Sequence, residues 1–234
     1  MAALEALNEA VVDCRRCPRL VEWRERVARE KRAAYRDWDY WGRPMQGFGD
    51  PAARILILGL APAAHGGNRT GRIFTGDRSG DFLFASLHRV GLANQAESIS
   101  RDDGLALRGA YIAAAVRCAP PANLPTPEER SNCSEWLERE VALLGDVHLV
   151  MCLGGFAWES VFRTIAALTG DDARPRPRFG HGEVARAGGY EIVGSYHPSQ
   201  QNTFTGKLTQ PMLRDALATA VQLADSQETG RTNR

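Results

Sequence analysis

Four cysteines have the chemistry and the spacing of a metal site. Cys14 and Cys17 form a C-x-x-C pair, and Cys118 and Cys133 lie much later, on either side of a Pro-rich loop. In a reducing compartment, thiols arranged in this way are metal ligands more often than disulfides. Zinc and an iron–sulfur cluster both accept four thiolates, and the spacing alone does not choose between them. Cys152, the fifth, lies in an apolar run and is best interpreted as a packed free thiol.

The elements that must position these thiols follow an alternating pattern. Short, continuous apolar runs typical of buried parallel strands occupy residues 54–60, 111–116, 147–153 and 191–196. Helical patterns precede and separate them: an N-terminal helix on Leu4, Leu7 and Val11, a helix from a Ser79 cap to Gly91, one from a Thr126 capping box, and helices over 156–168 and 210–223. The pattern predicts one three-layer α/β/α domain on a mostly parallel sheet of about four strands. The domain would span residues 1–224, with an N-terminal metal-binding segment and a flexible tail at 225–234.

The charge pattern is local rather than global. The formal net charge is only +1, but residues 15–43 carry nine Arg and one Lys against five acids, and residues 174–178 alternate Arg with Pro. Such patches fit a DNA footprint, although a solvated helix face would have the same composition. The N-terminus has no secretory pattern and no apolar run reaches the length of a membrane span, so we expect a cytoplasmic protein without membrane contact.

The segments that follow the four predicted strands should form the site, because ligands bind beyond the carboxyl ends of parallel strands. Residues 59–77 are rich in small residues but lack the phosphate-loop and dinucleotide fingerprints. Phe74 lies among polar and Gly residues, where a ring is a candidate for stacking on a base. Asp77 precedes a helix, so it is either a capping carboxylate or a catalytic one.

The later strand ends carry further candidates. Asn123 lies in the Pro-rich loop, where a turn role is the ordinary one. Gly154 and Gly155 open a helix and could bind a phosphate on free backbone N–H groups. His197 and Ser199 flank a proline at the end of the last strand, and a histidine there could donate a hydrogen bond or a proton.

Taken in this order, and together with the four cysteines, these motifs resemble the uracil-DNA glycosylase superfamily. The resemblance is strongest to its family 5, the type-b glycosylases that carry an iron–sulfur cluster, and it covers roughly residues 14–220. Its anchors are the cysteines and three motifs: Gly59-Leu60-Ala61-Pro62-Ala63, Phe74-Thr75-Gly76-Asp77 and His197-Pro198-Ser199.

The resemblance implies a role for each motif residue. Cys14, Cys17, Cys118 and Cys133 would hold a 4Fe–4S cluster. Phe74 would stack on the uracil, His197 would donate a hydrogen bond to the leaving base, and Asp77 would orient water or stabilise the sugar cation. The remaining contacts would be with DNA phosphates through Gly154, Gly155 and Ser199, and with the base through Ala61, Pro62, Ala63, Ala114 and Asn123.

Two positions depart from the wider superfamily. Many members carry Asp, Asn or Glu in the first motif, whereas this chain has Ala61, as family 5 sequences do. Many also present an Asn from the second strand to read the uracil edge, and the corresponding residue here is Ala114. A pocket with few fixed polar groups should discriminate less, so a broad base range is expected. Asn123 could compensate from its loop.

The resulting hypothesis is a monomeric, monofunctional glycosylase that hydrolyses the N-glycosidic bond of uracil, and of other deaminated bases such as hypoxanthine, in double- or single-stranded DNA. Two alternatives belong to other classes. One is a non-catalytic iron–sulfur protein that binds damaged DNA, although the basic inserted loop of a covalent-binding group is missing after Gly91. The other is a zinc-stabilised α/β hydrolase acting on free nucleosides.

Overall fold

The structure, a computed structural model, describes residues 1–232 and the side chains as far as residue 226. One six-stranded sheet has the order β1-β3-β2-β4-β6-β5. Its strands are β1 (Phe48–Gly49), β2 (Ile55–Gly59), β3 (Ala110–Ala114), β4 (Leu149–Leu153), β5 (Val184–Ala187) and β6 (Tyr190–Ser195). The helices are α1 (Ala2–Val12), α2 (Pro18–Glu30), α3 (Gly67–Thr70), α4 (Arg78–Arg89), α5 (Pro127–Leu143), α6 (Gly155–Thr169), α7 (Gln200–Phe204) and α8 (Gln210–Thr232), with short 3-10 turns η1 (Ala33–Tyr35) and η2 (Pro121–Asn123).

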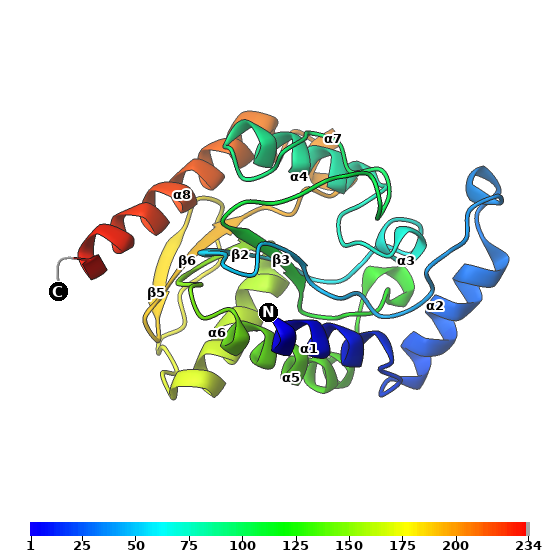
Figure 1. Ribbon diagram of the computed structural model, residues 1–234, viewed down its shortest axis with the longest axis horizontal. Helices are drawn as coiled ribbons and strands as arrows, with labels where there is room; N and C mark the ends of the chain where they lie inside the picture. The colour runs from blue at the N-terminus through cyan, green and yellow to red at the C-terminus, as the bar shows by residue number, and fades with distance from the viewer. Residues whose placement is uncertain (233–234) are drawn as a thin grey trace.

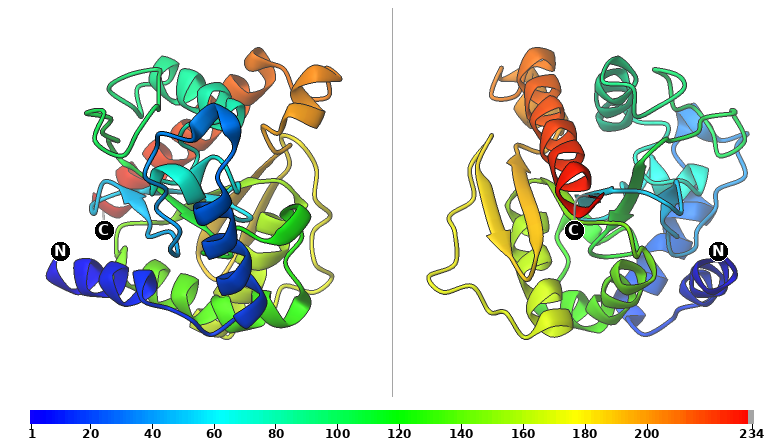
Figure 2. Two further views of the ribbon diagram at one scale, coloured as in Figure 1. Left: turned by 90° about the vertical axis from the view of Figure 1, so that its right-hand side faces the viewer. Right: turned by 60° about the vertical axis from the view of Figure 1, so that its left-hand side comes forward.

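Helices cover both faces of the sheet and make three layers (Figure 1). On one face α4 and α8 pack against each other, and α8 also contacts β2, β4 and β6. On the other face α6 lies on the same strands, α5 packs beside α6, and α1 packs on α5. The views in Figure 2 show this division, with the sheet between the two groups of helices. The predicted α/β/α layering is therefore confirmed.

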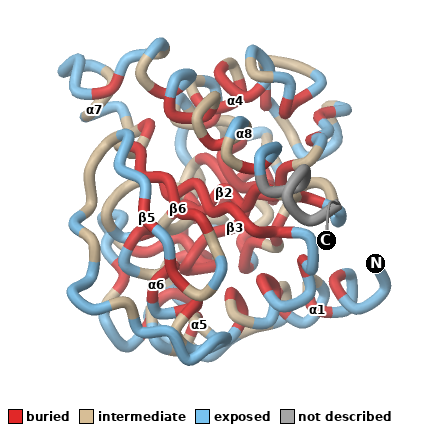
Figure 3. Tube along the Cα trace, turned by 90° about the vertical axis from the view of Figure 1, so that its left-hand side faces the viewer, coloured by how far each residue is buried: buried red, intermediate tan, exposed pale blue. Residues whose placement is uncertain are grey.

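The four predicted strands are the four inner strands of the sheet. β3, β2, β4 and β6 are parallel, and every residue of β2, β3 and β4 is buried (Figure 3). This burial explains why their sequences are continuously apolar instead of alternating. Their carboxyl ends point to one edge of the sheet, where the candidate site residues follow.

The sheet has six strands rather than about four, because two antiparallel edge strands were not predicted. β1 has only two residues, too few to give a pattern. β5 alternates exposed and buried residues, as a half-covered edge strand does. A two-residue hairpin turn, Gly188–Gly189, joins β5 to β6, and both glycines have positive φ, 53° and 85°. This Gly-Gly pair was an available hairpin signal.

The helix starts correct one prediction and confirm another. α4 is capped by Asp77 and not by Ser79: Asp77 Oδ1 accepts hydrogen bonds from the backbone N–H groups of Ser79 and Gly80, at 2.9 and 3.0 Å. Ser79 is the second residue of the helix. The capping box of α5 forms as predicted, between Thr126 and Glu129 with Pro127 in the first turn. Cys133 and Trp136 of α5 face the core.

The two terminal helices frame the domain. α1 buries Leu4, Leu7 and Val11, as its spacing predicted. α8 continues past the predicted end at 223 to Thr232, so the predicted tail begins as an extension of the helix, and residues 233 and 234 lie outside the described residues. A search of the described helices found no segment with the length and apolarity needed to cross a bilayer.

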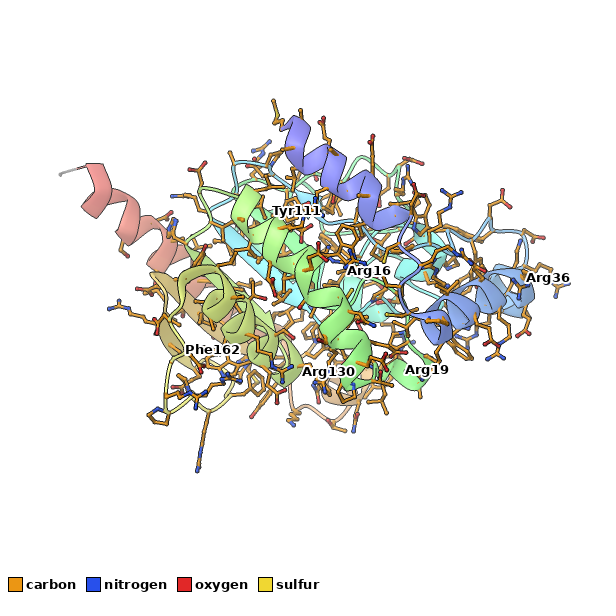
Figure 4. The ribbon with its side chains drawn as sticks, turned by 90° about the horizontal axis from the view of Figure 1, so that it is seen from below. Arg16, Arg19, Arg36, Tyr111, Arg130 and Phe162 are labelled. Atoms are coloured by element: carbon orange, nitrogen blue, oxygen red, sulfur yellow. The ribbon has the colours of Figure 1, made fainter. Side chains whose placement is uncertain are left out.

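Two arginines of the basic stretch at residues 15–43 connect the N-terminal segment with α5. Arg19 makes two hydrogen bonds to the Glu129 carboxylate, at 2.8 and 2.7 Å, and Arg16 pairs with Glu135 at 2.6 Å. Figure 4 shows Arg16, Arg19 and Arg130 along this side of the molecule, with Arg36 beyond the end of α2. The interpretation of the stretch as a DNA footprint therefore applies only to its other arginines.

Candidate active site

The end of the sheet brings together two rings that are far apart in sequence. Phe74 follows β2 and α3, and His197 follows β6. Their ring centroids are 5.8 Å apart, with the planes inclined at 34°. Phe74 is buried and has a positive φ of 51°, which is uncommon for a bulky residue and indicates that its surroundings hold it in place.

Two strand-end glycines leave room for this ring pair. Gly59 ends β2, and a Cβ added there would lie 2.9 Å from Phe74 Cζ. Gly154 follows β4, and a Cβ added there would lie 3.3 Å from His197 Cβ. Both distances are tighter than ordinary carbon contacts. The glycines therefore let backbone and rings approach closely at the carboxyl edge of the sheet.

His197 is half-buried, and its imidazole is electrically neutral at physiological pH. Burial lowers the pKa of the ring to about 4 because an apolar environment disfavours the charged form. Among the described residues no hydrogen bond is made by either ring nitrogen. The backbone is fixed instead, since the His197 carbonyl accepts a bond from Asn202 Nδ2 at 2.9 Å. A neutral imidazole can still donate one N–H hydrogen bond to a ligand.

The two carboxylate oxygens of Asp77 have different surroundings, the helix start and the cleft. Oδ1 caps α4, whereas Oδ2 lies so close to Gly66 that a Cβ on that glycine would collide with it. Burial raises the pKa of the Asp77 carboxyl, and hydrogen bonds from Gly80 and Ser79 together with the charge of Arg69 act in the opposite direction. One carboxylate thus starts a helix and faces the site.

A cleft of about 580 Å³ opens beside Asp77. Two further predicted base-contact residues, Ala63 and Asn123, line it with Asp77, and η2 carries Asn123 to this position with a positive φ of 58°. The sequence did not single out the other residues of its wall, which are Arg32, Tyr35, Ala64, His65, Gly66, Gly76, Arg78, Gln200 and Phe204. The cleft is large enough for a nucleotide-sized ligand.

The remaining predicted site residues lie around the Phe74–His197 ring pair and the cleft beside Asp77. Ala114 ends β3 and pairs in register with Gly59 on β2, so it is buried near Phe74. Gly155 begins α6, which has no side-chain cap at Gly154, and Ser199 begins α7. Pro62 is buried and Ala61 is half-buried. None of these residues lines the cleft.

The four predicted ligand cysteines converge on one hollow. It is lined by Cys14, Cys17, Cys118 and Cys133, with Cys152 elsewhere in the core on β4. Within the described chain, no three His, Cys, Asp or Glu side chains are arranged to hold a single metal ion. The described cysteines form no disulfides. The four thiols are therefore available as ligands for a group larger than a single ion, which they could surround.

Nitrogen donors surround the sulfurs of this hollow. Arg24 is buried and donates to Cys118 Sγ at 2.8 Å, and the Arg117 backbone N–H donates to Cys133 Sγ at 3.3 Å. Asn132 Nδ2 lies 3.7 Å from Cys17 Sγ. Hydrogen bonds of this kind stabilise sulfur that carries negative charge, as the thiolate ligands of an iron–sulfur cluster do. The donor set therefore fits such a cluster.

Two side chains of the segment 59–77, His65 and Arg69, were given no role by the sequence. His65 Nδ1 is 3.1 Å from the Tyr40 hydroxyl. Arg69 is buried, and its guanidinium contacts the rings of Tyr35 and Trp38. An Arg beside a Gly-rich loop is an ordinary surface pattern, so only the packing reveals its position.

Comparisons with known proteins agree with this geometry. The sequence model of the uracil DNA glycosylase superfamily matches residues 46–220. The type-5 uracil-DNA glycosylase of Mycobacterium tuberculosis is 55% identical over 220 residues, covering 93% of this chain and 81% of the relative. That of Thermus thermophilus is 50% identical, covering 94% and 98%. A type-4 uracil-DNA glycosylase of Archaeoglobus fulgidus is 29% identical, covering 72% and 74%.

Proposed function

We propose that this chain, which belongs to the uracil-DNA glycosylase superfamily, is a type-5 uracil-DNA glycosylase that hydrolyses the N-glycosidic bond in base excision repair. The observation that carries the proposal is the Phe74–His197 ring pair at the ends of β2 and β6. A glycosylase must take a base out of the duplex, hold its flat face and stabilise the leaving anion. A buried ring beside a neutral hydrogen-bond donor supplies these functions in one place.

On the base side, Phe74 offers its face to the flipped pyrimidine. His197 would donate its N–H to the oxygen on which negative charge develops as the bond breaks. Because the pKa of His197 is lowered to about 4, the ring acts as a neutral donor and does not transfer a proton. A fixed donor aimed at developing charge accelerates the step because its hydrogen bond is strongest in the transition state.

On the sugar side, Asp77 would face the cation that forms when the base departs with the bonding electrons. Its position is fixed by the α4 cap and by the close contact with Gly66. A carboxylate held beside the sugar lowers the energy of the cation, and it can align the attacking water. Since Ala61 has no polar group, Asp77 is the acid of this segment that serves both purposes.

The DNA backbone would be held by main-chain groups at the same edge. Gly154 precedes α6 and its own N–H donates to the Ser195 carbonyl at 2.8 Å, but the first N–H groups of the helix, from Gly155 on, have no side-chain cap. Such N–H groups bind phosphate, helped by the helix dipole. Ser199, at the start of α7, offers a hydroxyl for a second phosphate. These contacts carry no base information, so they position the strand without reading its sequence.

The four thiols would hold a 4Fe–4S cluster, which would serve as a structural cross-link between the N-terminal segment and the sheet. This is supported by the common hollow of Cys14, Cys17, Cys118 and Cys133 and by the donors to their sulfurs. Cys118 follows β3 and Cys133 lies on α5, so the cross-link would fasten α1 and α2 to the main domain.

The test uses purified protein with a uracil-containing oligonucleotide, followed by alkali to cleave any abasic site. We expect strand cleavage that depends on both uracil and protein, and free uracil as the released product. Binding of the uracil oligonucleotide without release of the base would support the non-catalytic alternative. Hydrolysis of free nucleosides with intact DNA would instead support a nucleoside hydrolase.

The pocket should also accept hypoxanthine. Ala61, Ala63 and Ala114 present methyl groups where a strict enzyme needs polar side chains, and few fixed hydrogen bonds mean little penalty for an altered base. We expect single-turnover excision of hypoxanthine from a mismatch at a rate well above background. A hypoxanthine rate at background, with rapid uracil release, would show that another residue, such as Asn123, supplies the discrimination.

A further inference from the structure

Arg69 is a buried cation without a carboxylate partner. Of the other three buried arginines among the described residues, Arg72 pairs with Asp103 and Arg117 with Glu140, and Arg24 donates to Cys118 Sγ. Among the described ion pairs none includes Arg69, and its Nη1 has no hydrogen-bond partner. Burial of an unpaired charge is unfavourable for folding. A fold that retains one in contact with two residues of the cleft wall, His65 and Gly76, points to a functional reason.

The contacts of Arg69 lead to the segment that carries Asp77. Its Nε donates to the His65 carbonyl at 2.8 Å, and its Nη2 donates to the Gly76 carbonyl at 2.7 Å. Both acceptor residues line the cleft, and Gly76 directly precedes Asp77. Through these two hydrogen bonds Arg69 connects the loop after β2 with the residues that precede α4.

Aromatic packing fixes the orientation of this guanidinium. Its carbon lies 4.0 Å from the ring centroid of Tyr35 and 4.2 Å from that of Trp38. Gly76 has a φ of +73°, and a Cβ on it would collide with Arg69 Nη2. A planar, always-charged group is therefore held against a backbone turn that only glycine allows.

We propose that Arg69 is a positioning residue for the reaction at this site: it holds the Gly76 carbonyl and thereby fixes the Asp77 carboxylate at the cleft. The inference rests on the proposed function, since it needs a carboxylate whose placement matters to the chemistry. Arg69 itself touches neither base nor sugar. It acts through geometry and through its positive charge, which favours the ionised carboxylate.

The effect of the Arg69 charge on Asp77 should appear in the pH profile of uracil excision. Burial raises the pKa of Asp77, and Arg69 lowers it, whereas Asp81 on α4 raises it. The other charged or titratable groups that line the same cleft are Arg32, His65 and Arg78. Removing Arg69 removes an influence that favours the ionised form. The acid limb of the excision rate should therefore move to higher pH.

The experiment measures single-turnover uracil excision against pH for the wild type, Arg69→Gln, Arg69→Lys and the control Arg108→Gln. Arg108 is exposed just before β3, at the amino ends of the strands and outside the cleft. For Arg69→Gln we expect a plateau rate up to about 10²-fold lower, the loss typical of a misplaced catalytic group, and an acid limb at higher pH. Arg69→Lys should restore the limb but not the plateau, because Lys keeps the charge and loses the planar pair of bonds. Arg108→Gln should match the wild type.

A double variant separates positioning from general damage. In an Asp77→Asn background, Arg69→Gln should cost little more, because the group that it positions is no longer charged. An equal loss in both backgrounds, or a wild-type plateau and acid limb in Arg69→Gln, would overturn the inference. If Arg69→Gln does not fold, Arg69→Lys decides: a full wild-type plateau would overturn it. An inactive wild type would instead contradict the proposed function.

Discussion

His197 shows how burial determines the chemical form of a single residue. We predict that His197→Ala binds uracil DNA almost normally but excises uracil about 10²–10³-fold more slowly in single turnover. The loss belongs to the chemical step, because the hydrogen bond strengthens only as the leaving base gains charge. Affinity and single-turnover rate, measured on the same oligonucleotide, test this. Equal losses in affinity and rate, or no loss in rate, would contradict this role of His197.

The pH dependence of that loss follows from the lowered pKa of about 4. Because the folded pKa lies below the ordinary value, the ring is neutral throughout the range from about pH 5.5 to 8. The ratio of wild-type to His197→Ala rates should therefore stay constant over this range. A ratio that grows as the pH falls toward the ordinary histidine pKa would mean that the charged ring is the donor.

Asp77 and Asp81 provide a matched pair of carboxylates at the start of α4. Asp77→Asn keeps a side-chain oxygen for the helix cap and removes the charge, so excision should fall by about 10²-fold or more while the melting temperature stays near that of the wild type. Asp81 is exposed in the first turn, where its charge favours the helix dipole. Asp81→Asn should therefore stay active. The reverse result would assign the role to Asp81, and two active variants would leave the sugar cation to groups other than these carboxylates.

Among the elements, the strand ends depend on small residues. In Gly59→Ala the added carbon would press on the Phe74 ring, so the ring must shift from its position beside His197. We expect slower uracil excision with a smaller change in melting temperature. Gly145→Ala is the control, because a Cβ there meets nothing within 4 Å. If Gly59→Ala excises uracil at the wild-type rate, the Phe74–His197 geometry does not limit the reaction.

The sequence predicted the elements that a continuous pattern can reveal. Continuous apolar runs predicted the inner strands, because burial on both faces leaves a local pattern in the sequence. The Thr126 capping box predicted the start of α5, because cap chemistry is also local. The two-residue β1 has no periodicity to detect. The sequence offered both Ser79 and Asp77 as caps of α4, because both side chains can accept from backbone N–H groups, and only the backbone geometry chooses Asp77.

The candidate site was less accessible to sequence reasoning than the fold. Motif residues such as Phe74 and His197 could be named, but their pairing depends on how the ends of β2 and β6 meet. Arg69 carried no signal, because its position arises from Tyr35, Trp38 and Gly76, which lie on separate segments. Contacts between segments that are distant in the sequence arise from tertiary packing, and a single sequence has no local pattern that predicts them.

At the scale of the whole molecule, the N-terminal segment is attached to the domain in several ways. α1 packs on α5 through apolar residues, and ion pairs connect Arg16 and Arg19 with α5. Exposed ion pairs contribute little stability. The proposed cluster on Cys14, Cys17, Cys118 and Cys133 would add a covalent attachment for α2 and the turn after it, and that turn brings Tyr35 to the cleft.

Loss of one converging thiol should consequently affect more than the metal site. A cross-link that closes a loop of this length is worth on the order of 4 to 5 kcal/mol in the chain-entropy account. We predict that the wild type is brown, and that Cys118→Ala is colourless, melts at lower temperature and is cut by protease near α2. Cys152→Ala is the control: Cys152 is buried on β4, away from the other thiols, so this variant should keep its colour per mole of protein despite a modest loss of stability. Iron, sulfide and zinc analysis decides the chemistry, since one zinc per colourless wild-type chain would contradict the cluster. Full colour in Cys118→Ala would remove that thiol from the ligand set.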